Sequence, residues 1–336
     1  MLSALAYIYE KLVNVRNALY DRDILDVLDL GAHTISVGNI TAGGTGKTPL
    51  VGYIARLLSD RGETVCILTR GYGRNKPKER VLVSNGKQII TDAMSAGDEP
   101  VELAHSLGAK AIIIADADRV AAAEWALRKF DVSVLVLDDG FQHRRAKRDV
   151  DIVCIDATDP FGGGSMLPKG RLREPVGGLC RAGIVVITRA NLSDDLQELT
   201  ETVSEIAPDA KVFTAANKTS AITPLVSFFG NAGHDTVADA RPAFAFCGLG
   251  NPSNFFDQLK IDGIDVAGSR AFRDHHRYSQ ADVCAIETDA LASGAKQLLT
   301  TAKDAVKLGG LVFSLPCNVV EISVEIDDAE TLNQLL

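Results

Sequence analysis

The chain has 336 residues, of which 46% are hydrophobic and 24% charged, so it is long and apolar enough for one large or two medium globular domains. Its net charge of −9 at pH 7 argues against broad nucleic-acid binding, and any basic surface must be local. The six cysteines are scattered without a C-x-x-C pair, which favours core thiols in a reducing compartment and gives no indication of a zinc or iron–sulfur site.

Residues 1–22 predict an amphipathic helix. Charged residues interrupt the segment, so it is too polar to span a bilayer, and it lacks the basic start and cleavage site of a signal peptide. The helix could pack on a domain or lie at a membrane interface, and the pattern leaves both open. The apolar positions recur at a spacing of three and four residues: Leu5, Ile8, Leu12, Val15 and Leu19.

A phosphate-binding loop is predicted between a strand at Ile35–Val37 and a helix that begins near Gly46. Backbone N–H groups of such a loop and a helix N-terminus suit a polyphosphate, with Lys47 reaching the β- and γ-phosphates and the Thr48 hydroxyl on Mg²⁺. Thr41 stands where the usual pattern has glycine, and an ordinary glycine-rich turn is the alternative. The predicted nucleotide-binding residues are Thr41, Ala42, Gly43, Gly44, Thr45, Gly46, Lys47 and Thr48.

After this loop, short β-branched runs alternate with helical stretches such as Pro100–Leu107 and Arg119–Lys129. This alternation predicts an α/β fold of the P-loop NTPase type, a doubly wound and mostly parallel sheet with helices on both faces. In such sheets ligands bind beyond the carboxyl ends of the strands. The predicted strands are Val65–Leu68, Ala111–Ile114, Val134–Leu137, Ile152–Ile155 and Ile184–Ile187.

Charged residues follow three of these strands. Asp138 and Asp139 end one apolar strand, where a phosphate-loop enzyme holds Mg²⁺ through its waters, although a turn or capping role is the alternative. The sequence T-R-G-Y-G-R follows Val65–Leu68, and Arg119 follows the next strand. Asp98 begins a helix, either as a cap or as a base.

Two basic clusters suggest an anionic ligand or an anionic membrane surface, with solvated loops as the alternative. We expect them on the same rim of the sheet as the acidic pair. The first cluster is Arg144, Arg145, Lys147 and Arg148, and the second is Lys169, Arg171 and Arg173.

A second α/β pattern starts from about Asp235, with strands at Ala243–Cys247, Gln297–Thr301 and Val319–Val324. His275 lies in an Asp-His-His run before a helix, which is either a cap or a functional site. We therefore expect three parts: an N-terminal helix at 1–22, a nucleotide-binding domain at 23–218, and a smaller domain at 219–336 that includes the connecting strands.

Eight motifs in this order resemble the tetraacyldisaccharide 4′-kinase family, the lipid A 4′-kinases of Gram-negative bacteria. The resemblance covers Tyr7 to about Leu308, and Thr41 is typical of this family's loop. The motifs are V-G-N-I-T-A-G-G-T-G-K-T-P, T-R-G-Y-G-R, G-D-E-P, L-D-D-G-F-Q-H, L-P-K-G-R-L-R-E-P, G-L-G-N-P, D-H-H-R-Y and T-T-A-K-D-A-V-K.

The resemblance implies transfer of the ATP γ-phosphate, with Mg²⁺, to the 4′-hydroxyl of a tetraacylated disaccharide 1-phosphate. It also implies peripheral attachment to the cytoplasmic face of the inner membrane through the N-terminal helix. The basic rim would then meet lipid phosphate, and no nucleic-acid partner is expected.

The resemblance also implies roles for individual residues. Asp98 matches the catalytic carboxylate, and His275 matches the histidine that works with it. The motifs lie in different expected domains, so we expect closure to assemble the site. The other matching positions are Lys47 and Thr48 for phosphate and metal, Asp138 and Asp139 near the metal, and Arg119, Arg173 and Glu174 elsewhere in the active site.

Two positions depart from the family pattern. Arg273 replaces a proline before the Asp-His pair, and Ala302 replaces a glutamate before Lys303. Both lie in the expected second domain, and they leave open how that domain closes.

Two rival functions remain open in the sequence. A regulatory GTPase would normally carry [NT]-K-x-D for guanine, and the nearest approaches, at 188–191 and 217–220, do not fit. A soluble small-molecule kinase would not depend on residues 1–20 for membrane association.

Overall fold

The computed structural model describes residues 1–229 and 242–336, so the predicted restart near Asp235 lies outside the described residues. The chain forms two compact units. Unit 1 comprises Met1–Arg70, Asp116–Ala216 and Val324–Leu336, and unit 2 comprises Gly71–Ala115 and Asn217–Ser323.

This division differs from the expected contiguous domains 23–218 and 219–336. Segment 71–115 contributes to unit 2, and the C-terminal residues return to unit 1. The long strands β8 (Lys211–Pro224) and β12 (Cys317–Ile326) each begin in one unit and end in the other, which lets the chain leave and re-enter unit 1 late in the sequence.

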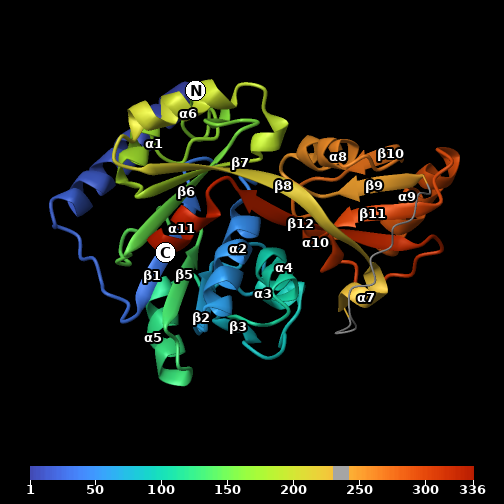
Figure 1. The fold of residues 1–336 in the computed structure, drawn as a ribbon, viewed down its shortest axis with the longest axis horizontal. Helices are drawn as coiled ribbons and strands as arrows, with labels where there is room; N and C mark the ends of the chain where they lie inside the picture. Colours follow the sequence, from blue (N-terminus) through green and yellow to red (C-terminus); the bar gives the residue numbers. More distant parts are fainter. Residues whose placement is uncertain (230–241) are drawn as a thin grey trace. The chain divides into compact units, whose positions relative to one another are not determined.

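Unit 1 is built on a parallel sheet with the strand order β8-β7-β6-β1-β5-β2 (Figure 1). Its central strands are fully buried, as their continuous β-branched sequences predict. The strands wholly in unit 1 are β1 (His33–Asn39), β2 (Val65–Thr69), β5 (Val134–Asp138), β6 (Val150–Asp156) and β7 (Ile184–Thr188).

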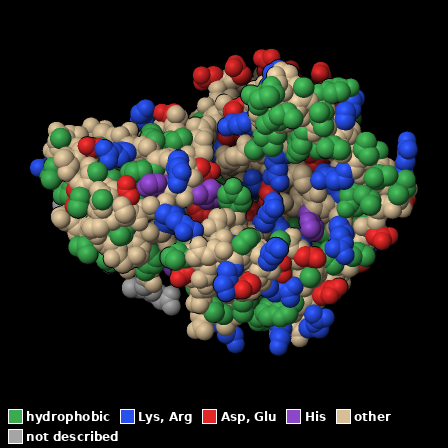
Figure 2. Space-filling model, turned by 180° about the vertical axis from the view of Figure 1, so that it is seen from behind, with side chains coloured by type: hydrophobic (Ala, Val, Ile, Leu, Met, Phe, Trp, Pro, Cys, Tyr) green, Lys and Arg blue, Asp and Glu red, His purple; other side chains and the backbone are tan. Residues whose placement is uncertain are grey.

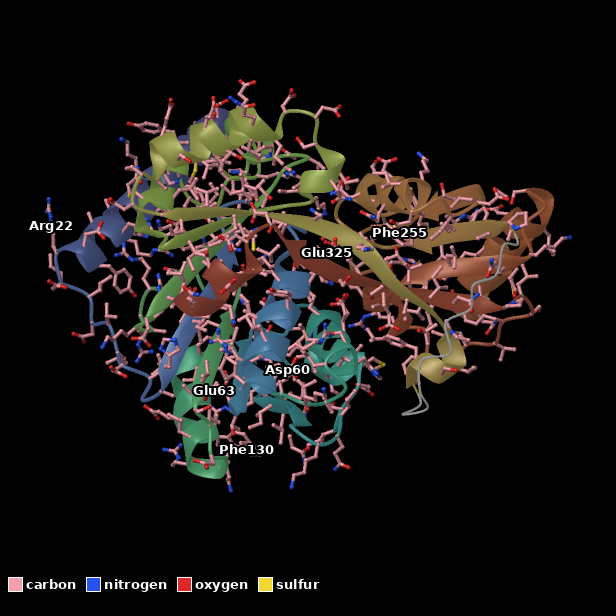
Figure 3. All side chains as sticks on the ribbon, in the orientation of Figure 1. Arg22, Asp60, Glu63, Phe130, Phe255 and Glu325 are labelled. Atoms are coloured by element: carbon pink, nitrogen blue, oxygen red, sulfur yellow. The ribbon has the colours of Figure 1, made fainter. Side chains whose placement is uncertain are left out.

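Helices cover this sheet. Helix α2 packs on β1, β2 and β5, and α5 packs on β2. Figure 3 labels Asp60, the last residue of α2, so the helix can be followed back from there to the phosphate loop. The helices of unit 1 are α1 (Leu2–Asp21), α2 (Lys47–Asp60), α5 (Arg119–Lys129), α6 (Leu196–Ile206) and α11 (Ala329–Leu335), with short 3₁₀ segments η1 (Gly162–Gly164), η2 (Val176–Arg181) and η3 (Ala190–Leu192).

Unit 2 contains a second parallel set in the order β10-β9-β11-β12, and an antiparallel pair, β3 and β4. Phe255, labelled in Figure 3, packs in its core with residues of β9. The elements wholly in unit 2 are β3 (Val81–Asn85), α3 (Ala93–Ala96), α4 (Asp98–Ser106), β4 (Ile112–Ala115), α7 (Leu225–Phe229), β9 (Ala243–Cys247), α8 (Pro252–Ile261), β10 (Val266–Ala271), α9 (Gln280–Ala292), β11 (Gln297–Thr301) and α10 (Ala302–Ala305).

The fold class and the five strands predicted after the phosphate loop are confirmed, with strand ends within two residues of the expected positions. The sequence reading did not identify β3 or β10, which have mixed burial patterns in place of a continuous apolar run.

Helix α1 is present, but its predicted apolar stripe does not pack on the domain. Leu5, Ile8, Leu12 and Val15 are between 46% and 65% exposed. A neighbouring face, containing Ala6 and Val13, joins the core that also holds residues of α6. No helix among the described residues is long and apolar enough to cross a bilayer.

Candidate active site

The phosphate loop of unit 1 has the backbone geometry that its glycines predict. Gly43 has φ +114°, and Gly46 adopts the left-handed conformation with φ +76° immediately before α2. Asn39 donates to the Thr45 hydroxyl at 2.9 Å, and the Thr188 hydroxyl donates to the Thr45 carbonyl at 2.8 Å. The loop is therefore held on both sides in a shape that accepts phosphate.

Thr41 fits the loop as a buried side chain. It forms a β-bridge with Leu172, and the neighbouring Ala42 N–H donates to the Arg171 carbonyl at 2.7 Å. The segment after η1 thus supports the loop at the position where the common motif has glycine.

Asp138 and Asp139 point in different directions, as expected for neighbours at a strand end. Asp138 is buried, and its Oδ2 accepts a hydrogen bond from the Thr69 hydroxyl at 2.9 Å. Asp139 has a left-handed φ of +56°, and its Oδ1 lies 2.7 Å from Arg173 and 3.7 Å from the Lys47 ammonium. The left-handed turn directs the second carboxylate at the Lys47 ammonium.

Asp139 is ionised. Burial alone would raise its pKa, but the charges of Lys47 and Arg173 outweigh burial and hold the pKa at about 2. At neutral pH this carboxylate therefore fixes two cations that a polyphosphate can also use.

Arg119 lies at the start of α5 and is buried, so burial lowers its pKa while Asp138 and Asp139 act in the opposite sense. Its guanidinium donates to the carbonyls of Asp116 and Asp138 at 2.9 and 3.3 Å. These bonds connect the segment that follows the predicted strand Ala111–Ile114 to the end of β5. The sequence predicted that the residues after these two strands lie at one edge of the sheet.

Glu174 contacts the N-terminal helix. Its fully buried carboxylate accepts from Arg181 at 2.8 Å and from Asn17 at 3.0 Å, and Arg16 lies 3.6 Å away. Tyr9, also on α1, donates to the carbonyl of Arg173 at 3.2 Å. The structure therefore places Glu174 as an anchor between α1, η2 and the segment that carries Arg173.

The residues of the two basic clusters are distributed over both edges of the sheet, so they do not all share the expected rim. Arg144 and Arg148 border the same surface pocket as Val150 and Ile184, the first residues of β6 and β7. These two residues therefore lie at the amino edge. Arg145 of the same cluster pairs instead with Asp118 at 3.6 Å, and Arg173 of the second cluster reaches the carboxyl edge at Asp139.

In unit 2, Asp98 and His275 form a direct pair. His275 Nδ1 lies 3.0 and 2.8 Å from the two carboxylate oxygens of Asp98, which is 6% exposed. The hydrogen bond to Asp98 raises the pKa of His275. Burial opposes ionisation of Asp98, but the bond to His275 and the charges of Lys303 and Lys307 outweigh it and lower the pKa of Asp98.

The residues that position this pair have unusual backbone conformations. His275 has a left-handed φ of +59°, which is unusual for a non-glycine residue. The Tyr72 ring lies 5.0 Å from the imidazole. Gly97, next to Asp98, has φ +97°, and a Cβ there would lie 2.6 Å from the Tyr72 carbonyl. The motifs T-R-G-Y-G-R, G-D-E-P and D-H-H-R-Y therefore meet around one carboxylate.

The capping alternative for His275 is wrong. The helix that follows, α9, is capped by Ser279, whose hydroxyl accepts from the Asp282 N–H in a complete capping box. The expected separation of Asp98 and His275 between domains is also wrong, because both residues belong to unit 2. Segment 71–115 folds with the C-terminal motifs, so the pair is already assembled in this structure.

A buried carboxylate, Asp304, supports the pair. It accepts hydrogen bonds from Thr301 at 2.7 Å, from the Gly248 N–H at 2.9 Å and from Tyr278 at 3.0 Å. Lys307 lies 2.9 Å from Asp304 and 3.6 Å from Asp98, so it connects the two carboxylates. Sequence reasoning gave Asp304 no role, although the T-T-A-K-D-A-V-K motif contains it.

Lys303 and Glu102 are two further residues that the sequence reading did not single out as functional. Lys303 lies 3.0 Å from Glu99 and 3.2 Å from Asp274. Burial lowers its pKa, but the surrounding carboxylates outweigh this and raise it. Burial raises the pKa of Glu102, one turn after Asp98, to about 8. Spacing on the helix was the only signal available for Glu102.

The two departures from the family pattern leave this arrangement intact. Ala302 begins α10, which Thr301 caps by accepting from the Asp304 N–H. The Arg273 carbonyl accepts from the His276 N–H at 3.1 Å and closes the turn that carries His275.

The donor set at the phosphate loop fits Mg²⁺. The Thr48 hydroxyl and the Asp138 carboxylate are hard oxygen donors. Among the described residues, no group of three or more histidine, cysteine, aspartate or glutamate side chains is placed so that it could hold a metal ion. The two oxygen donors of Thr48 and Asp138 suit a cation that is otherwise bound by phosphate and water.

Comparison with known proteins identifies the family. A family model described as tetraacyldisaccharide-1-P 4′-kinase matches residues 1–336.

The chain belongs to the tetraacyldisaccharide 4′-kinase family.

Two relatives with this name illustrate the similarity. The tetraacyldisaccharide 4′-kinase of Halothermothrix orenii is 40% identical over 318 residues, which is 91% of this chain and 82% of the relative. That of Syntrophus aciditrophicus is 35% identical over 347 aligned positions, covering 100% of this chain and 91% of the relative.

A solved structure of a tetraacyldisaccharide 4′-kinase shares this fold. It is LpxK from Aquifex aeolicus, described as an "apo" form in complex with ATP. The TM-score is 0.80 at 33% identity, with 99% of this chain and 96% of that chain covered. The α/β fold expected from the strand–helix alternation is therefore shared with this structure over nearly the whole chain.

Proposed function

We propose that this tetraacyldisaccharide 4′-kinase family member transfers the γ-phosphate of ATP to the 4′-hydroxyl of tetraacyldisaccharide 1-phosphate. The observation that carries the proposal is the Asp98–His275 pair, at 2.8 Å, in a chain that also has a complete phosphate loop. The loop alone would fit any nucleotide hydrolase, whereas a buried acid–imidazole pair supplies a base for an alcohol acceptor.

Residues of unit 1 would bind the nucleotide. Lys47 and the N-terminus of α2 would bind the β- and γ-phosphates. Arg173, held 2.7 Å from Asp139, would stabilise charge on the transferring group. Asp139 would keep both cations aligned before the nucleotide arrives.

Thr48 and Asp138 would hold Mg²⁺, Asp138 through water. A bound Mg²⁺ neutralises charge on the phosphate oxygens. Asp138 suits this role because Thr69 orients its carboxylate, while Asp139 is committed to Lys47 and Arg173.

Residues of unit 2 would activate the acceptor. A sugar hydroxyl is a poor nucleophile at neutral pH, and a positioned base contributes about 10²–10⁴-fold to the rate. Asp98 and His275 would act together, with the proton of the 4′-hydroxyl passing to the pair as the oxygen attacks phosphorus. Lys303 and Lys307 keep Asp98 ionised for this step.

We propose a peripheral location at the cytoplasmic face of the bacterial inner membrane. Its support is the exposed stripe of α1, because an apolar stripe left in water is typical of an interfacial helix. Figure 2 shows hydrophobic side chains exposed among lysines, arginines, aspartates and glutamates on one face of the molecule. This face has mixed charge, so the support for the proposal is the apolar stripe of α1.

Transfer of label from γ-labelled ATP to tetraacyldisaccharide 1-phosphate in detergent micelles tests the activity. We expect labelled lipid from the natural chain and none from Lys47→Ala. Label released only as free phosphate, with or without lipid, would contradict the proposal and indicate a nucleotide hydrolase.

A further inference from the structure

The segment after β7 lies directly against the phosphate loop. The Thr188 hydroxyl donates to the Thr45 carbonyl at 2.8 Å, and Arg189 donates to the Gly44 carbonyl at 2.9 Å. A Cβ on Gly46 would lie 3.1 Å from Thr188. These contacts all fall within unit 1.

The backbone of this segment is strained, which indicates a constraint beyond chain reversal. Arg189 has a left-handed φ of +56° and leads into the short segment η3. Its guanidinium also pairs with the buried carboxylate of Asp156 at the end of β6. Arg189 is therefore fixed from two sides, and the partly buried Asn191 follows on a defined turn.

The strand order indicates which end of a nucleotide would lie near this segment if its phosphates occupied the phosphate loop. The order is β7-β6-β1-β5, with the phosphate loop following β1. Asp138 and Asp139 follow β5, on one side of the loop, and there Asp139 engages Lys47 and Arg173. The reacting phosphate belongs on that side. The nucleoside end of the same polyphosphate then extends toward the opposite side, where β7 ends.

We infer that Asn191 reads the nucleobase and selects adenine over guanine. This inference rests on the proposed use of ATP. The carboxamide of asparagine offers one acceptor and one donor group, which complement the N6 amino group and the N1 acceptor of adenine. Guanine presents two adjacent donors, N1–H and N2–H₂, which an acceptor-only carboxylate matches better.

The sequence around Asn191 agrees with this chemistry. Thr188-Arg189-Ala190-Asn191 has the spacing of the guanine motif [NT]-K-x-D, with an amide in place of the carboxylate. Thr188 and Arg189 donate hydrogen bonds to carbonyls of the phosphate loop. These bonds fix the segment that carries Asn191 beside that loop. The substitution at its fourth position changes which base is accepted.

The test compares ATP and GTP for the natural chain and for Asn191→Asp. Dissociation constants are measured by displacement of a fluorescent nucleotide without lipid, and kcat/KM is measured with lipid. A bidentate base contact discriminates by about tenfold or more. We expect Asn191→Asp to weaken ATP binding and to shift the ATP:GTP preference toward GTP by at least about tenfold. Asn191→Ser should weaken ATP binding without a gain for GTP.

Asn217→Asp is the matched control, because it makes the same chemical change in the other approach to the motif, at 217–220. It should leave the ATP:GTP ratio unchanged. Melting temperatures confirm that the variants fold. An ATP:GTP ratio that stays within about twofold of the natural value in both Asn191 variants would overturn the inference.

The experiment distinguishes a failure of the proposed kinase activity from a failure of the role inferred for Asn191. Binding of ATP without transfer to lipid would contradict the kinase proposal but leave the base preference measurable. A natural chain that binds ATP and GTP equally would overturn the role of Asn191 while leaving lipid phosphorylation intact.

Discussion

Asp98 combines burial with an ionised state, which is an unfavourable combination unless charged partners surround it. The structure supplies these partners: His275 at 2.8 Å and Lys307 at 3.6 Å, with Lys303 adding long-range attraction. A carboxylate held in this way is ready to act with its imidazole as one proton-accepting unit.

The pair predicts the pH dependence of kcat/KM. The bond to Asp98 raises the pKa of His275 above its usual 6.5, so the protonated pair persists to higher pH and must lose its proton before it can accept another. Activity should fall as the pH drops through an apparent pKa above 6.5. A pH–rate profile measures this limb.

Substitutions separate the members of the pair. Asp98→Asn should lower kcat by about 10²–10⁴-fold with little change in ATP affinity. His275→Gln should lower kcat. It should also abolish the fall in activity that the natural enzyme shows as the pH drops through the neutral range. An Asp98→Asn enzyme with near-normal turnover, or an unchanged profile in His275→Gln, would contradict the assignment.

Asp304 should matter for stability because three donors and Lys307 converge on it. Removing one member of a buried ionic network costs about 3–5 kcal/mol, since the remaining groups lose their partner. Asp304→Ala should lower the free energy of unfolding by this amount in urea denaturation. Asp257→Asn, an exposed carboxylate on α8, is the control and should change it by no more than about 0.5 kcal/mol.

At the scale of single residues, the sequence predicted those carried by recognisable motifs. Lys47, Asp139 and Asp98 each lie in a motif that is contiguous in the chain. The supporting role of Asp304 and the attachment of Glu174 to α1 were not predicted, because a partner distant in sequence leaves no local pattern.

At the scale of elements, the periodic pattern of α1 predicted the helix correctly but did not predict which face of the helix is buried. The three-four spacing predicted the helix, but the stripe it defines faces solvent. The buried face contains Ala6 and Val13, while Tyr9 and Asn17 make hydrogen bonds to the segment at 173–174. Hydrophobic periodicity gives no information about polar contacts of this kind.

The exposed stripe predicts membrane binding through α1. Replacing Ile8 and Leu12 with glutamate should weaken binding to vesicles that contain anionic lipid, because it removes apolar area and adds repulsive charge. Flotation on a density gradient measures the effect. The control variant Lys129→Glu, at the C-terminal end of α5 in the same unit, should float like the natural protein. Equal flotation of both variants would contradict the role of α1.

Among the strands, continuous apolar runs were recognised and mixed ones were not. The segment 211–229 has no continuous apolar run, yet it contains the long strand β8 followed by α7. β8 runs from unit 1 into unit 2, and its burial lacks the continuous pattern of the predicted strands.

At the scale of the whole molecule, the C-terminal residues complete the nucleotide-binding unit. Leu332 on α11 is fully buried, and the Leu336 carbonyl lies 3.0 Å from His33 Nε2 at the start of β1. Asp327 and Thr214 exchange two hydrogen bonds within the same unit.

Leu332→Ala should therefore destabilise the unit that binds ATP. Such a truncation costs about 2–5 kcal/mol in a packed core. We expect a lower melting temperature that saturating ATP partly restores, because ligand binding favours the folded state. Leu335→Ala, at an exposed position of the same helix, should have little effect. Equal melting of the two variants would show that α11 does not support this unit.

The sequence by itself determined the fold class, the phosphate loop, the buried parallel strands and the family, because these depend on local patterns and on motifs contiguous in the chain. Only the tertiary structure decided that segment 71–115 folds with 217–323, that Asp98 and His275 already touch, and that the apolar stripe of α1 faces solvent. Each of these depends on contacts between residues far apart in sequence, and such contacts are selected by packing and charge pairing in the folded chain.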